Sequence, residues 1–157
     1  MRSLDLSSAL GATLVFALIY AQAFFLGGFE TDDLIDTGHS LYGYVVSTVV
    51  VFALVTLICM FTYFLEILLF KAISFKHKKR VGVVFYLLVG IVVGVSLSLF
   101  YLHFDEFSYF LKTATVLTTV GSILFYFIKT FVDSVALKKI LALSPIVTIV
   151  VIYVLVR

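Results

Sequence analysis

The stretch Lys71-Ala-Ile-Ser-Phe-Lys-His-Lys-Lys-Arg80 lies between two long apolar runs and holds five of the chain's eleven lysine and arginine residues. Basic residues next to a membrane span resist translocation and remain on the cytoplasmic side. The stretch therefore predicts a cytoplasmic loop in a multi-pass protein of the cell membrane. The side of every other loop follows by counting outward from it.

The composition excludes a soluble domain. The 157 residues are 63% hydrophobic and 13% charged, with a mean hydropathy of +1.23, whereas about a quarter of the residues in soluble domains are charged. Lipid must therefore cover part of the apolar surface. The net charge of +2 is small and confined to loops, so we expect no nucleic-acid partner. A single cysteine, Cys59, excludes an internal disulfide and a cysteine-based metal site.

The apolar runs predict an all-α integral membrane protein with five transmembrane helices in one domain over residues 1–157. The predicted spans are residues 8–26, 41–66, 81–102, 113–131 and 140–156. A span needs about 20 residues to cross a hydrocarbon core of roughly 30 Å. The last run is short and has Pro145 in its first two turns, where a missing N–H costs least. A bundle of four helices is therefore the alternative. The compact chain without appended domains favours a bacterial origin.

The distribution of basic and acidic residues predicts on which side of the membrane each loop lies. The segments expected inside hold most of the basic residues, namely Arg2, Lys71, Lys76, Lys78, Lys79, Arg80, Lys129, Lys138 and Lys139. The Phe29–Ser40 loop has four acidic residues and no lysine or arginine, so we expect it to be extracellular. The N-terminus is then inside and the C-terminus outside.

The first run has a second interpretation. Arg2, the apolar core over residues 9–20 and Ala21-Gln22-Ala23 resemble a signal peptide with an A-x-A cleavage site. Asp5 offsets Arg2, and more apolar residues follow the site, which favours an uncleaved span. Whether residues 1–23 are removed stays open, and both interpretations place the following loop outside.

Small residues recur on the third predicted span. Gly90, Gly94 and Ser98 share one helical face, and the two glycines form a G-x-x-x-G pair. Because small side chains let a neighbouring backbone approach closely, these residues are predicted to pack against another helix.

Glu66 is the ionisable residue of greatest interest, because a carboxylate within or near a transmembrane span is costly and is a candidate for function. If the helix continues to Phe70, Glu66 lies about one turn inside the inner interface and needs a partner, with Lys71 and Lys129 available. The favoured alternative is an interfacial glutamate in contact with headgroup water, since charges near helix ends readily extend to the interface.

Hydroxyl groups form a second pattern, in which Thr118 and Ser122 of the fourth span are candidates for lining a polar cavity. Helix packing is the favoured account. His39 with Asp36, and His103 with Asp105 and Glu106, lack a recognised ligand spacing. We therefore predict no metal, no cofactor and no catalytic residue.

Three functions are open. The favoured one is a non-catalytic accessory or interaction protein, a class that includes immunity-type proteins, whose helices dock to a membrane-protein partner or to copies of itself. The alternative is a small oligomeric transporter or channel subunit with Glu66 as the coupling carboxylate. A membrane enzyme acting on lipid ranks last. Under all three, the Lys71–Arg80 loop is expected to attract anionic headgroups of the lipid bilayer.

Overall fold

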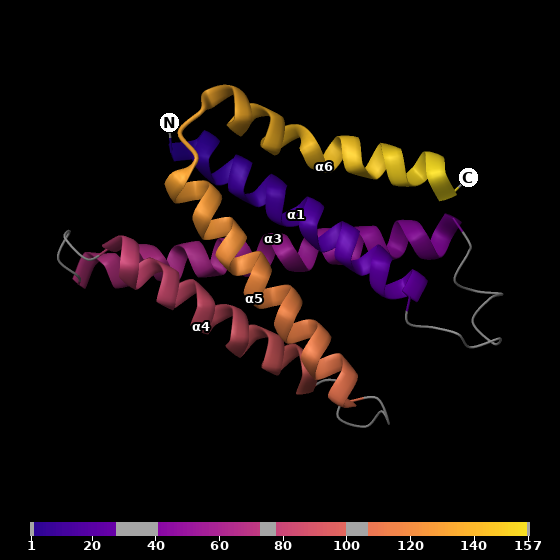
Figure 1. The fold of residues 1–157 in the computed structure, drawn as a ribbon, viewed down its shortest axis with the longest axis horizontal. Coiled ribbons are helices and arrows are strands. Elements are labelled where there is room, and N and C mark those ends of the chain that lie inside the picture. Colours follow the sequence, from indigo (N-terminus) through magenta and orange to yellow (C-terminus); the bar gives the residue numbers. More distant parts are fainter. Residues whose placement is uncertain (1, 28–40, 73–77, 100–106, 157) are drawn as a thin grey trace.

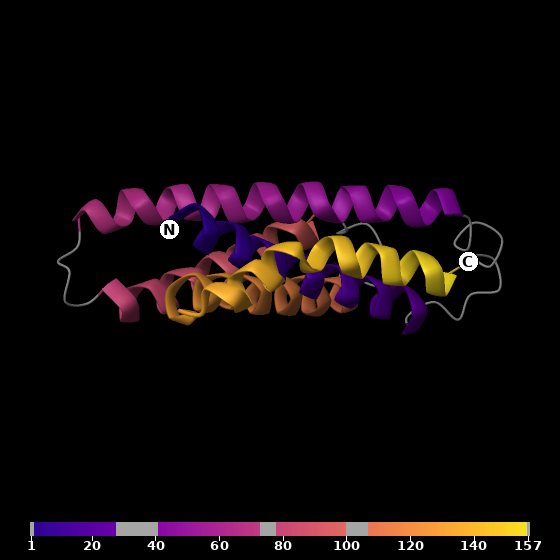
Figure 2. The same cartoon turned by 90° about the horizontal axis from the view of Figure 1, so that it is seen from above.

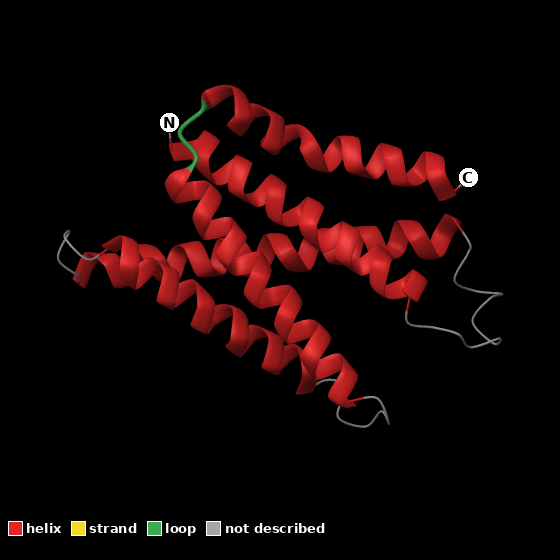
Figure 3. Cartoon of the chain, in the orientation of Figure 1, coloured by secondary structure: helices red, strands yellow, loops and turns green. Residues whose placement is uncertain are grey.

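The structure, a computed structural model, describes residues 2–27, 41–72, 78–99 and 107–156 (Figure 1). These residues form five helices, and the described part of the chain contains no strand (Figure 3). The short link 132–134 connects the last two helices. The helices are α1 (Arg2–Gly27), α3 (Leu41–Ala72), α4 (Lys78–Leu99), α5 (Phe107–Phe131) and α6 (Val135–Val156). The predicted all-α class is confirmed.

Among the described residues, four helices are long and apolar enough to cross a membrane. Their candidate spans are Ser3–Tyr20, Thr48–Lys71, Lys78–Leu99 and Leu111–Phe131. A run of about 20 apolar residues matches the thickness of the hydrocarbon core. By length and composition, these four helices therefore match membrane spans.

Helix α3 continues beyond the predicted end of the second span at residue 66. It runs without a break over 32 residues to Ala72, which corresponds to about 48 Å at 1.5 Å per residue. Such a helix exceeds the hydrocarbon thickness of about 30 Å, an excess that membrane helices accommodate by tilting or by extending beyond the hydrocarbon core. Figure 1 shows α3 crossing α1 and α5 obliquely.

The helices form two layers. Helix α1 contacts α3, α5 and α6, and α4 packs along α5, while α3 lies in a layer of its own against them (Figure 2). The starts of α1, α4 and α6 and the ends of α3 and α5 lie at one end of the molecule (Figure 1). We call this end, which carries Lys71, Lys78, Lys79, Arg80, Lys129, Lys138 and Lys139, the basic end.

Helices α4 and α5 approach closely along a stripe of α4 with a four-residue repeat. The buried residues of α4 are Gly82, Tyr86, Gly90, Gly94 and Ser98. A Cβ atom added at Gly90 would lie 2.5 Å from the Cα of Thr119, and one at Gly94 would lie 2.5 Å from the Cα of Thr115. The two backbones are in contact only because no side chain separates them.

Helices α1 and α6 meet at a second close approach. Pro145 has no N–H, so the carbonyl of Leu141 lacks its partner within the helix. The Ser144 hydroxyl donates a hydrogen bond of 2.7 Å to this carbonyl, and Gly11 of α1 packs directly against it. Because α6 begins at Val135, Pro145 lies deeper in the helix than the sequence predicted, and Ser144 satisfies the carbonyl that it leaves free.

Candidate functional site

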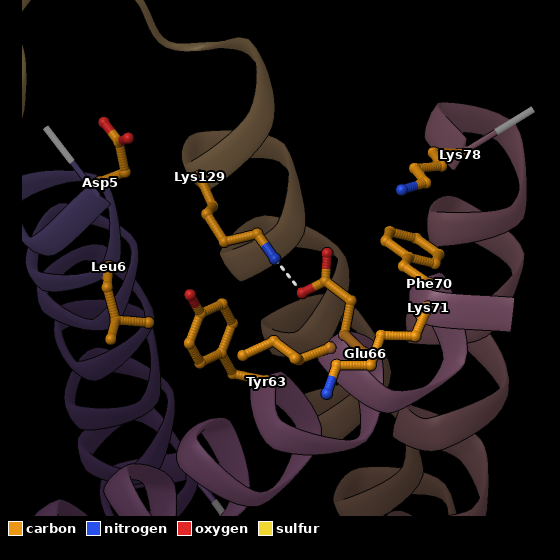
Figure 4. Close-up of a pocket in the computed structure, with 9 residues that line it drawn as sticks. Asp5, Leu6, Tyr63, Glu66, Phe70, Lys71, Lys78 and Lys129 are labelled. Carbon is orange, nitrogen blue, oxygen red and sulfur yellow. Dashed lines mark hydrogen bonds and ion pairs between the residues drawn. The ribbon is translucent and has the colours of Figure 1, made fainter. Parts of the chain in front are cut away.

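The candidate site is built around the carboxylate of Glu66, which α3 places near the basic end. Glu66 is 7% exposed. Its Oε2 atom accepts a hydrogen bond of 2.8 Å from the hydroxyl of Tyr86 on α4 and forms an ion pair with Nζ of Lys129 on α5. Figure 4 shows the Lys129 ammonium directed at this oxygen. One carboxylate oxygen therefore joins three helices.

Aromatic rings surround the cation of this pair. The Lys129 Nζ atom lies 5.0 Å from the ring centroid of Tyr63, 5.2 Å from that of Tyr86 and 5.6 Å from that of Tyr126. It also lies 3.3 Å from the Tyr86 hydroxyl. Ring faces attract a cation within about 6 Å of their centroid. These rings partly replace the water that the buried ammonium has lost.

The burial of Glu66 differs from the favoured expectation of an interfacial glutamate in headgroup water. The reason is the length of α3: the helix continues past Glu66 to Ala72, which places the carboxylate between helices and within reach of Lys129. Removing two charges from water is costly, and the pair persists only if each charge has a partner. The polar contacts of Glu66 therefore hold α3 to α4 and α5.

A second ion pair joins α1 to α6 at the basic end. Nζ of Lys138 lies 2.5 Å from Oδ1 of Asp5, and Lys138 is 7% exposed. Sequence reasoning missed this pair, because it treated Asp5 only as an offset to Arg2 and Lys138 only as part of a basic connection. No local spacing could reveal it, since the two residues are far apart in the chain.

A cavity of about 410 Å³ opens beside Glu66 (Figure 4). Helices α1, α3, α4 and α5 line it with Asp5, Leu6, Tyr63, Glu66, Ile67, Phe70, Lys71, Lys78 and Lys129. Its lining combines charged groups with apolar and aromatic side chains. The cavity can therefore accept an amphipathic molecule that has a charged end.

Thr118 and Ser122 are not among the residues that line this cavity. The Thr118 hydroxyl lies 2.6 Å from the carbonyl of Gly90 on α4 and 2.8 Å from that of Ala114 in its own helix. Thr118 thus links α5 to the glycine stripe, and Ser122 is half-buried. Ser98 donates its hydroxyl to the Gly94 carbonyl at 2.8 Å.

Tyr86 and Tyr126 are site residues that the sequence analysis did not single out. Tyr86 is 1% exposed and stacks on Phe125 at 5.9 Å, while Tyr126 donates a hydrogen bond of 3.0 Å to the Lys79 carbonyl at the start of α4. A signal for Tyr86 was present. It lies four residues from both Gly82 and Gly90, so it is a large polar ring within a stripe of small residues.

Several residues that the sequence analysis considered lie outside the part of the chain that the structure describes. These residues are the Phe29–Ser40 loop with His39, the histidine His103, and residues 73–77 of the basic loop. Within the described ranges, no group of three or more histidine, cysteine or acidic residues is arranged to hold a metal ion.

Comparisons with known proteins identify no relative: no family model, no curated protein and no solved structure matches the chain. Function is therefore inferred from the side chains described above.

Proposed function

We propose that the protein is a non-catalytic interaction protein of the cell membrane that docks through α3 to a helix of a second copy or of another membrane protein. The observation that supports this proposal is that the candidate spans are buried to different extents by the rest of the chain. Only 11% of the α3 span is buried within the chain, compared with 28% of the α4 and α5 spans and 44% of the α1 span.

The uncovered face of α3 has the pattern of a helix-packing seam. Bulky apolar residues recur at alternating spacings of four and three along it, and each is well exposed: Val50, Leu54, Leu57, Phe61, Phe64 and Leu68. This spacing keeps side chains on one side of a helix and is the spacing of helix–helix seams. In a bilayer, helices associate through van der Waals packing and interhelical hydrogen bonds rather than through the hydrophobic effect.

The contacts of two polar side chains, Glu66 and Thr118, support a non-catalytic role. The Glu66 carboxylate is bound by Lys129 and Tyr86, and the Thr118 hydroxyl is bound by the Gly90 carbonyl. These groups join helices of the same chain. A catalytic nucleophile or base must instead be directed at a place where a substrate can bind.

The proposal includes a topology of five spans, with the basic end in the cytoplasm and the C-terminus outside. Basic residues concentrate on the cytoplasmic side of membrane proteins, and seven described basic side chains lie at the basic end, whereas Lys112 lies near the start of α5 at the other end. Helix α6 is then the fifth span, and four spans remain the alternative.

Site-specific photo-crosslinking tests the docking face. A photoreactive residue replaces Leu57 on α3, which is 67% exposed, and the matched control replaces Ile146 on α6, which is 64% exposed. We expect a discrete protein adduct from α3 only. Two differently tagged copies of the chain in the same membrane distinguish a second copy from another protein. Lipid adducts alone at both positions would contradict the proposal.

One observation favours the second function, a transporter or channel subunit with Glu66 as the coupling carboxylate. Glu66 is a buried ionisable residue within an apolar span and lies beside a cavity, which is the setting of proton-relay carboxylates. This function requires a proton or ion flux in proteoliposomes that Glu66→Gln abolishes. Absence of flux in the wild type, or equal flux in the variant, would exclude it.

A further inference from the structure

An open groove of about 390 Å³ lies between α3 and α4 near the basic end. One residue of α3 and five residues of α4 line it, namely Leu69, Arg80, Val81, Val84, Phe85 and Leu88. Its wall is apolar throughout, so Arg80 contributes the carbon stem of its side chain to the wall and not its guanidinium group. Val84 is 57% exposed and Leu88 is 55% exposed. The rest of the chain therefore leaves this side of α4 uncovered.

The groove is about one lipid leaflet deep. Arg80 is near the start of the α4 span, which begins at Lys78, and the helix rises about 12 Å from Arg80 to Leu88 at 1.5 Å per residue. Half of a hydrocarbon core of roughly 30 Å is about 15 Å. The groove therefore begins where headgroups meet hydrocarbon and ends within the same half of the bilayer, which is the depth that a lipid acyl chain occupies.

The charged residue of the groove is Arg80. Its side chain is exposed, and no ion pair within the described ranges involves it, whereas Lys129 and Lys138 each have a carboxylate partner. A guanidinium group carries five N–H donors and binds a phosphate group through two parallel hydrogen bonds. Long basic side chains lay their carbon stem along apolar surface and keep their charge at the membrane interface. Arg80 therefore suits a phosphate group at the head of an acyl chain.

We propose that this groove binds one anionic phospholipid, with an acyl chain along Val84 and Leu88 and the phosphate group on Arg80. No carboxylate lines the groove, so it offers no counter-ion to the ammonium group of a zwitterionic headgroup, and an anionic lipid is preferred. A membrane-spanning helix of a partner would need a groove along most of α4, whereas this one ends at Leu88.

This binding is distinct from the general attraction of a basic loop for an anionic surface. It has a stoichiometry of one lipid, and it depends on the shape of the groove as well as on charge. It is also independent of the docking of α3 to a partner.

Native mass spectrometry of the full chain tests the charge of the site. The purified, delipidated protein is titrated with dioleoyl phosphatidylglycerol and, separately, with dioleoyl phosphatidylcholine. We expect the first phosphatidylglycerol to bind at least fivefold more tightly than phosphatidylcholine. Arg80→Gln should weaken the binding of this phosphatidylglycerol about fivefold, since a basic residue at the membrane surface contributes roughly that factor to the binding of an anionic lipid. Equal binding of the two lipids by the wild type would overturn the proposal.

The control for charge is Lys139→Gln. Lys139 is exposed at the same end of the molecule and does not line the groove, so its loss should change the affinity for phosphatidylglycerol less than twofold. A loss as large as that of Arg80→Gln would show that the lipid responds only to the overall positive charge, which would overturn the site.

Val84→Phe tests the shape of the groove without changing any charge. The larger side chain fills part of the groove, so it should weaken the binding of the first phosphatidylglycerol about fivefold. The matched control is Val92→Phe, because Val92 is on the same helix, is 62% exposed and does not line the groove. We expect less than a twofold change in this control. Equal effects of the two substitutions would overturn the proposal. Both valines are exposed, so the fold does not depend on their packing, and the unfolding temperature verifies this.

Photo-crosslinking in the membrane identifies the occupant of the groove. A photoreactive residue in place of Leu88 should give lipid adducts, and a discrete protein adduct at this position would overturn the lipid in favour of a protein partner. A protein adduct at Leu57 of α3 can form whatever the groove binds. The lipid site and the docking of α3 can therefore fail separately.

Discussion

At the scale of single residues, the ion pair between Glu66 and Lys129 makes a strong prediction about stability. Removing one partner leaves a buried charge without compensation, which costs about 3–5 kcal/mol, whereas removing both can be nearly neutral. Glu66→Gln and Lys129→Met should each lower the free energy of unfolding in detergent by roughly 3 kcal/mol. The double variant should lose much less than the sum. A double-mutant cycle measures this coupling, and additive losses would show that the two groups do not depend on each other.

The residue scale is also where the sequence predicted the site only in part. A carboxylate next to an apolar run identifies Glu66, and Lys129 was one of two partners that the charge pattern allowed. The choice between Lys129 and Lys71 depends on how α3 crosses α5, which no local pattern encodes. Tyr86 went unrecognised because a tyrosine in an apolar run looks like an ordinary interior or interfacial ring until its hydroxyl is found 2.8 Å from Glu66.

At the scale of helices, the space around two glycines, one in α4 and one in α5, predicts that replacing them by alanine has opposite effects on stability. Gly90→Ala places a methyl group 2.5 Å from the Thr119 backbone, so α4 and α5 must separate at a cost of about 1–3 kcal/mol. At Gly121 of α5 the nearest atom to an added Cβ is 3.6 Å away. Gly121→Ala should therefore stabilise the helix by up to about 1 kcal/mol. Unfolding in detergent measures both, and a Gly90→Ala variant as stable as the wild type would contradict the close packing.

The sequence predicted helices more securely than it predicted their ends. The four-residue repeat of Gly90, Gly94 and Ser98 indicated a packing face, and these residues do lie in the stripe that faces α5. Helix α6 begins at Val135 rather than at residue 140. Hydropathy could not show this start, because Lys138 lowers the apolar score of the first turns while its ion pair with Asp5 lets those turns pack.

At the scale of the whole molecule, the number of spans determines on which side of the membrane each loop and terminus lies. Residue 112 and residue 131 are separated by about 28 Å along α5 at 1.5 Å per residue, close to the hydrocarbon thickness of about 30 Å. A helix of this length that stands across the bilayer brings Lys112 to one surface and the link before α6 to the other. The side of the membrane on which the C-terminus lies then depends on whether α6 crosses as well.

Cysteine labelling determines on which side of the membrane each of these positions lies. Cys59 is buried, and in a Cys59→Ala background single cysteines replace Lys112, Lys139 or Arg157, the last of which lies outside the described residues. With a membrane-impermeant maleimide, we expect labelling of position 112 in intact cells and of position 139 only in inverted vesicles, because basic ends remain in the cytoplasm. With five spans, position 157 should label like position 112. If it labels like position 139, α6 returns to the cytoplasmic surface and the four-span bundle is correct. If positions 112 and 139 label from the same side, α5 does not cross, and the assignment of the basic end to the cytoplasm loses its basis.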